Sequence, residues 1–110
     1  MHEPPQHKLR VYGRACDLLR AIIAARVADA NLRTQAVRAA QSVCLNIAEG
    51  AGRVTRADKA RAFTIARGEC VEASAAIEIA CISGTASEAS NREVASIASD
   101  VYAMLTGLIR

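Results

Sequence analysis

Apolar residues recur every three or four positions along four stretches of this chain, and short polar or glycine-containing breaks separate the stretches. This spacing places side chains on one face of an α-helix. The pattern predicts helices over residues 8–28, 32–49 and 56–82, and a fourth from Ser90 to the C-terminus. The residues expected to face inward are Val11, Ala15, Leu18, Leu19, Ile22 and Ala25; Leu32, Ala36, Ala39, Ala40, Val43 and Ile47; Phe63, Ala66, Cys70, Ala73, Ile77 and Ala80; and Val94, Ile97, Val101, Leu105 and Leu108.

Several helix boundaries carry their own sequence signals. Thr55 and Asp58 have the spacing of a capping box, in which a hydroxyl accepts a backbone N–H bond at the helix start. Ser90 and Glu93 have the same spacing before the fourth helix. Gly84 is expected to end the third helix.

Short linkers between these helices predict the fold. Residues 29–31 join the first two helices, and a linker of a few residues makes each helix antiparallel to the previous one. The chain contains 24 alanines and only three aromatic residues, which favours thin and closely packed helices. We therefore expect an all-α protein, an antiparallel up-down-up-down four-helix bundle. Residues 8–110 would form this single domain after a flexible leader at 1–7.

The second helix carries a polar stripe beside its apolar face. At about 100° per residue the stripe falls within an arc of roughly 80°. It consists of Gln35, Arg38, Ser42, Asn46 and Glu49. Gly50 and Gly52 follow, and a left-handed glycine there would stop the helix. We expect Asn46 to hold the turn into Gly50, and Arg53 to compensate Glu49, whose charge the helix dipole disfavours. The alternative is a solvated helix face.

The same stretch resembles a known family. The matching positions are Leu32, Gln35, Arg38, Ala39, Ala40, Ser42, Asn46, Ile47, Ala48, Glu49, Gly50, Gly52 and Arg53. They fit the motif L-x-x-Q-x-x-R-A-A-x-S-x-x-x-N-I-A-E-G-x-G-R of the bacterial four-helix-bundle proteins encoded in intervening sequences of 23S rRNA genes. The similarity continues upstream through Leu9, Val11, Tyr12 and Ala15, and downstream through residues 65–68 and 104–110. Cys44 and Val37 depart from it, since many members have proline and arginine there.

Two of the helices have more apolar surface than one core requires. A second stripe of apolar and small residues follows the third helix, and a second face of small residues follows the second helix. The residues concerned are Val37, Cys44, Ala48, Ile65, Gly68, Ala75, Ile79 and Ile82. Surplus apolar surface predicts an interface between copies of the chain. The family resemblance implies a closed ring of five. The alternative is that the small residues only widen one core.

Charge is distributed unevenly along the chain. Residues 1–67 contain 12 Lys and Arg against 5 Asp and Glu, whereas residues 68–110 contain 2 against 6. In the expected topology, the start of the first helix, the loop between the second and third, and the end of the fourth lie at one pole. The basic residues predicted to gather there are Lys8, Arg10, Arg14, Arg53, Arg56, Lys59, Arg61 and Arg110. Arginine-rich clusters suit phosphate contacts, although such clusters also serve as solubilising surface.

Other chemistry finds little support. Cys16, Cys44, Cys70 and Cys81 lack C-x-x-C spacing, so we interpret them as structural thiols and predict no metal site. His2 and His7 lie in the leader, so the predicted domain contains no Ser/His/Asp or Cys/His combination for catalysis. We therefore predict that the protein is not an enzyme. No cofactor is expected. The absence of a signal peptide or a long apolar run predicts a cytoplasmic protein without membrane contact.

These observations predict a homo-oligomeric, non-catalytic helical adaptor. Its expected partners are further copies of itself, and RNA, DNA or a nucleic-acid enzyme bound through the basic pole. The family also resembles the accessory proteins of diversity-generating retroelements, which act with a reverse transcriptase and nucleic acid. The resemblance therefore implies a nucleic-acid enzyme as a partner. The alternative is a purely structural self-assembling protein with no nucleic-acid role.

Overall fold

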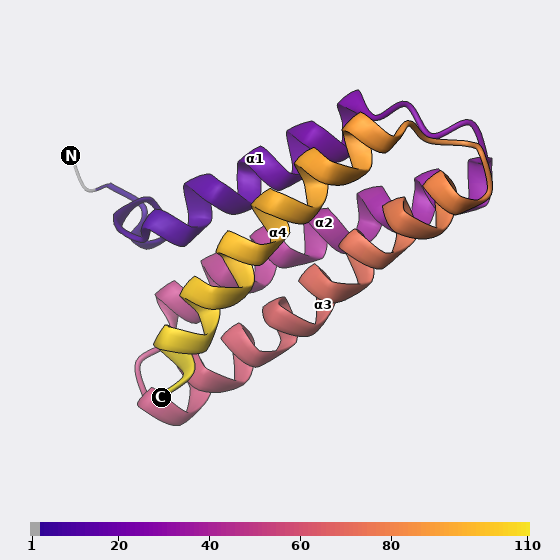
Figure 1. The fold of residues 1–110 in the computed structure, drawn as a ribbon. Coiled ribbons are helices and arrows are strands. Elements are labelled where there is room, and N and C mark those ends of the chain that lie inside the picture. Colours follow the sequence, from indigo (N-terminus) through magenta and orange to yellow (C-terminus); the bar gives the residue numbers. More distant parts are fainter. Residues whose placement is uncertain (1–2) are drawn as a thin grey trace.

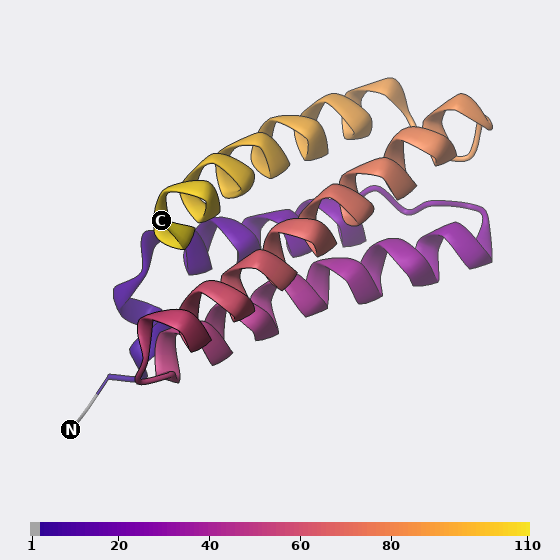
Figure 2. The same cartoon turned by 90° about the horizontal axis from the view of Figure 1, so that it is seen from below.

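Four antiparallel helices follow a short 3-10 turn in the computed structural model, which describes residues 3–110 (Figure 1). The elements are η1 (Pro5–Lys8), α1 (Arg10–Ala24), α2 (Ala30–Gly52), α3 (Arg56–Ile82) and α4 (Glu88–Ile109). Each helix runs back along the previous one, and α4 closes the bundle against α1 (Figures 1 and 2). The predicted all-α four-helix bundle is confirmed. Over residues 3–110, no helix combines the length and the apolar composition needed to span a membrane.

The core consists mainly of small side chains. Alanine is the commonest buried residue, and Leu18, Ile47, Ile77 and Leu105 are the largest side chains that are fully enclosed. The predicted inward-facing residues are buried, or half-buried at Leu19, Ala25 and Leu32, with one exception. Leu108 is 40% exposed, so its assignment to the core was wrong. It lies near the end of α4, where the bundle opens.

The first helix ends earlier than its apolar pattern predicts. Helix α1 stops at Ala24 rather than at residue 28, because Arg26 adopts a left-handed backbone with φ of 47°. This turn directs Val27 into the core, where it is 2% exposed. The N–H of Ala28 then donates to the carbonyl of Thr85 at 2.9 Å, which ties the α1–α2 connection to the α3–α4 connection.

The caps partly follow the predictions. Thr55 caps α3 by accepting the N–H of Asp58, and Gly84 follows the end of α3 with φ of 79°, so both predictions are confirmed. The Ser90–Glu93 capping box was wrong. Ser87 is the cap of α4 and accepts the N–H of Ser90, because the tight turn after α3 lets α4 begin at Glu88.

Helix α2 is longer than predicted at both ends. Asp29 caps it by accepting the N–H of Leu32, so residues 30 and 31 are helical rather than part of a linker. At the other end the helix continues through Gly50 to Gly52. It stops at Arg53, whose backbone is extended, so the predicted stop at a left-handed glycine was wrong.

Gly50 has a packing role instead of a conformational one. It is buried, and a Cβ built on it would lie 2.5 Å from Cε1 of Phe63. The missing side chain therefore lets the ring of Phe63 on α3 approach the backbone of α2. Gly52 has nothing within 4 Å of its Cβ position, although it is only half a turn away.

The four cysteines are free thiols. Cys70 is buried and donates its Sγ–H to the carbonyl of Ala98 on α4 at 3.4 Å. Burial raises the pKa of Cys70 to about 11. Burial and the neighbouring Cys16 raise the pKa of Cys44 to about 12. Both thiols are thus held in the protonated form, in which they are weak nucleophiles.

The leader is partly helical. Residues Pro5–Lys8 form η1, which packs against α2 and α1. Met1 and His2 of the predicted leader lie outside the described residues, and its flexibility stays a prediction.

We predict that Gly50→Ala lowers the free energy of unfolding by about 1–3 kcal/mol, because the added methyl group must displace the packed ring of Phe63. Gly52→Ala is the matched control and should leave stability unchanged or raise it by up to about 1 kcal/mol. Urea unfolding at one fixed protein concentration compares the two variants. Equal stability of both would show that the Phe63 contact does not restrict residue 50.

A second prediction concerns thiol reactivity. With a pKa of about 11, only about one Cys70 side chain in a thousand is a thiolate at pH 8. Iodoacetamide should therefore alkylate Cys70 and Cys44 far more slowly in the native protein than in urea, as followed by mass spectrometry of tryptic peptides. Equal rates in the two conditions would contradict the structural role of these thiols.

Candidate functional site

One end of the bundle gathers segments that are distant in sequence. The η1 turn, the α2–α3 connection and the end of α4 meet there (Figures 1 and 2). They line a cavity of about 480 Å³. Its lining consists of Lys8, Arg56, Lys59 and Arg110 together with Pro5, Leu9, Ala51, Phe63 and Leu108. Four of the eight residues predicted for the basic pole therefore surround one cavity, which we call the end cavity.

Lys59 has a defined structural position in this end cavity. Its Nζ donates to the carbonyl oxygens of Gly50 and Ala51 at 3.2 and 3.1 Å. These carbonyls belong to the last turn of α2, which lacks helical partners and carries the negative end of the helix dipole. Lys59 thus caps the C-terminal end of α2. The sequence had suggested only a glycine stop at this end.

Arg10 lies beside this group rather than within it. It lines a neighbouring cavity of about 420 Å³ between the start of α1 and the end of α4, and Lys8, Leu9 and Leu108 line both cavities. The positive charge at this end therefore extends from the end cavity onto the first turn of α1.

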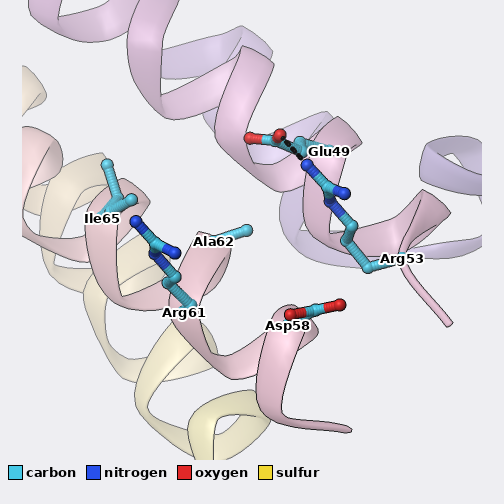
Figure 3. Close-up of a pocket in the computed structure, with 6 residues that line it drawn as sticks. All are labelled: Glu49, Arg53, Asp58, Arg61, Ala62 and Ile65. Carbon is cyan, nitrogen blue, oxygen red and sulfur yellow. Dashed lines mark hydrogen bonds and ion pairs between the residues drawn. The ribbon is translucent and has the colours of Figure 1, made fainter. Parts of the chain in front are cut away.

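Arg53 and Arg61 lie in a separate pocket between α2 and α3, of about 280 Å³ (Figure 3). Arg53 reaches back to Glu49, with Nη2 donating to Oε1 at 2.6 Å, so the predicted pair is confirmed. This hydrogen bond raises the pKa of Arg53. Arg61 extends beside Ile65, and Asp58 also lines the pocket (Figure 3). Two carboxylates thus balance the two guanidinium groups.

Arg14 does not join the basic pole. Its Nε and Nη2 donate to Oδ2 of Asp100 at 3.1 and 3.0 Å, and its Nη1 donates to Asp17 at 3.2 Å. These bonds raise the pKa of Arg14 and link α1 to α4. The prediction that Arg14 gathers with the other basic residues at the pole was wrong, because Arg14 pairs with Asp100, which is 86 residues away and which only the fold brings close.

The polar stripe of α2 is mostly exposed within the chain. Gln35, Arg38 and Glu49 are exposed, whereas Ser42 and Asn46 are half-buried. Asn46 Nδ2 donates to the carbonyl and the hydroxyl of Ser42 at 2.9 and 3.1 Å. It therefore bonds back along the helix, and the prediction that it holds a turn at Gly50 was wrong. Arg38 is exposed and makes no hydrogen bond or ion pair within residues 3–110.

The predicted interface residues divide into two groups. Val37 and Cys44 pack against the core, as expected if small residues only widen it. Ile65, Ile79 and Ile82 on α3 are 45%, 49% and 79% exposed, with Gly68 exposed and Ala48 and Ala75 half-buried. Val71 on α3 and Leu45 on α2 are also exposed, and the sequence analysis missed both. Both are large apolar residues that fall outside the predicted core faces of their helices, and this position could have indicated that they are exposed.

The apolar lining of the end cavity was also missed. Leu9 was assigned to the first helix, Ala51 to the break after the second helix, and Phe63 and Leu108 to the core. The alternation of Lys8, Leu9 and Arg10 near one end of the chain was the one local sign of an apolar site with a basic rim. Within residues 3–110, no three His, Cys, Asp or Glu side chains gather in a manner that could hold a metal ion.

Comparison with known proteins places the chain in a family. No individual curated protein matches it. The family model described as 23S rRNA-intervening sequence protein matches residues 7–107. This range includes α1, α2 and α3, α4 as far as Gly107, and the basic residues of the end cavity except Arg110. The chain therefore belongs to the 23S rRNA-intervening sequence protein family.

Proposed function

We propose that this protein is a non-catalytic, homo-oligomeric adaptor that binds the phosphate backbone of RNA or DNA through the basic end of its bundle. The observation that carries the proposal is the end cavity, where Lys8, Arg56, Lys59 and Arg110 come together from η1, α3 and the chain end after α4. Over residues 3–110, no acidic side chain lines it. A cluster of cations without local carboxylates attracts phosphate groups and releases their counterions.

The exposed apolar residues of α3 support self-assembly. Ile65, Ile79 and Ile82 recur at helical spacing on the side of α3 that points away from the core. Burying such side chains stabilises association by about 25 cal/mol per Å² of apolar surface before the costs of binding. A ring, with five copies as the family resemblance implies, would repeat the basic end around one axis and strengthen binding through several simultaneous contacts.

Self-assembly predicts a defined effect of Ile79→Glu. The substitution places an unpaired carboxylate in the proposed interface, so the oligomer should dissociate at micromolar concentration in light scattering. Ile23→Glu is the matched control, because Ile23 is 57% exposed on α1, outside the α3 stripe. A monomeric wild type, or equal masses for wild type and Ile79→Glu, would show that this stripe is not the interface.

Backbone binding predicts a change in salt dependence. Replacing Lys8 and Arg56 together by glutamine should weaken binding of a short labelled RNA in fluorescence anisotropy. It should also reduce the slope of log affinity against log salt by about 1.4, at roughly 0.7 per phosphate contact on a single strand. Lys59 is left intact because it caps α2.

Two single variants control for the loss of charge alone. Arg92→Gln removes a cation from the first turns of α4, and Arg14→Gln removes one that Asp17 and Asp100 already pair. Both should bind nearly as well as wild type. Losses as large as that of the double variant, or no binding of wild type at low salt, would leave the structural self-assembling protein as the better account.

A further inference from the structure

The end cavity has an apolar lining that binding of a phosphate backbone does not require. Phosphate contacts need only cations at a surface, yet five of the nine residues that line this cavity are apolar. Leu9 from the η1–α1 junction, Phe63 from α3 and Leu108 from α4 converge from three elements. Leu108 remains 40% exposed there although the same helix buries Leu105 completely. This apolar surface is suited to a flat, uncharged group next to an anion.

The cavity is closed on its inner side. Phe63 is only 4% exposed and is held against Gly50, so the ring forms a floor continuous with the core. A volume of about 480 Å³ lies within the roughly 300–1,000 Å³ range of small-molecule sites. A single nucleotide is a ligand of this size.

The charge of the rim favours the same occupant. Lys8, Arg56, Lys59 and Arg110 approach one cavity, whereas an internal phosphodiester carries one negative charge. A terminal phosphate monoester carries about −1.5 to −2 at neutral pH and offers three acceptor oxygens. Arginine binds two of these oxygens at once, and lysine adds a point charge.

We propose that the end cavity binds the terminal nucleotide of a phosphorylated nucleic-acid strand. The base rests against Leu9, Phe63 and Leu108, and the terminal phosphate binds the cations of the rim. This assignment rests on the proposed nucleic-acid function and adds to it a preference for strand ends. The shared chemistry is a nucleoside monophosphate, which a 5′ or a 3′ phosphorylated end can supply.

The test compares three labelled RNA 12-mers of one sequence, with a 5′-phosphate, with a 3′-phosphate, or with hydroxyl groups at both ends. The label is placed internally so that both ends are free. Anisotropy at moderate salt should show about tenfold tighter binding for one phosphorylated end than for the hydroxyl form, as expected for an additional charged hydrogen-bonded contact. Which end is preferred identifies the source of the phosphate.

The variant Ala51→Met tests the contribution of the cavity separately from that of the surrounding cations. Ala51 lines the cavity, so the longer side chain occupies the space of the base while all four cations remain. This variant should lose the preference for the phosphorylated end but keep salt-dependent binding of the hydroxyl form. Ala57→Met is the matched control, because Ala57 is exposed in the first turn of α3 and does not line the cavity. It should keep the preference.

The outcomes distinguish this inference from the proposed function. Equal affinity of wild type for all three RNAs, or a preference that survives Ala51→Met, would overturn the strand-end site while leaving backbone binding intact. No binding of any RNA at low salt would remove the proposed function itself.

Discussion

The close contact between Gly50 and Phe63 is the constraint on which the basic end of this protein depends. The chain has a single phenylalanine and no tryptophan, and its core is built largely from alanine. Helices with such cores must approach closely to exclude voids. At residue 50 even a methyl group does not fit beside the ring. The same contact joins the end of α2 to the start of α3, brings Lys59 within reach of the α2 carbonyls, and forms the floor of the end cavity.

An alanine-rich core also leaves larger apolar side chains without an internal position. Helix α3 buries Phe63, Cys70 and Ile77 and otherwise only alanines, while four of its aliphatic residues remain exposed. A monomer gains nothing by keeping this surface in water, since apolar area stabilises a protein only when it is removed from solvent. The composition that permits close helix packing therefore creates the surface on which self-assembly is proposed.

Much of the helical architecture could be predicted because it is local. Helical spacing identified the core faces, Thr55 and Gly84 marked both boundaries of α3, and a separation of four residues suggested the Glu49–Arg53 pair. The wrong predictions have a common cause, because they depend on contacts between residues that are far apart in the sequence. The role of Gly50 depends on Phe63 thirteen positions away, and the partner of Arg14 is Asp100 on the last helix. The spacing of Ser90 and Glu93 suggested Ser90 as the cap of α4, but the turn that ties residues 85 and 86 to Ala80 makes Ser87 the cap.

The availability of charge, rather than its amount, distinguishes the cations of the basic end. All eight residues predicted for the basic pole carry a positive charge, but Arg14 and Arg53 form ion pairs with carboxylates of the same chain. Lys59 donates hydrogen bonds to carbonyl oxygens, which carry no net charge. A paired guanidinium must release its partner before it can bind phosphate, so it contributes less to affinity than an unpaired one. The carbonyl bonds of Lys59 leave its net charge uncompensated, and its third N–H remains available. The field at the end cavity therefore comes from a subset of the basic residues, selected by where the fold places the acidic ones.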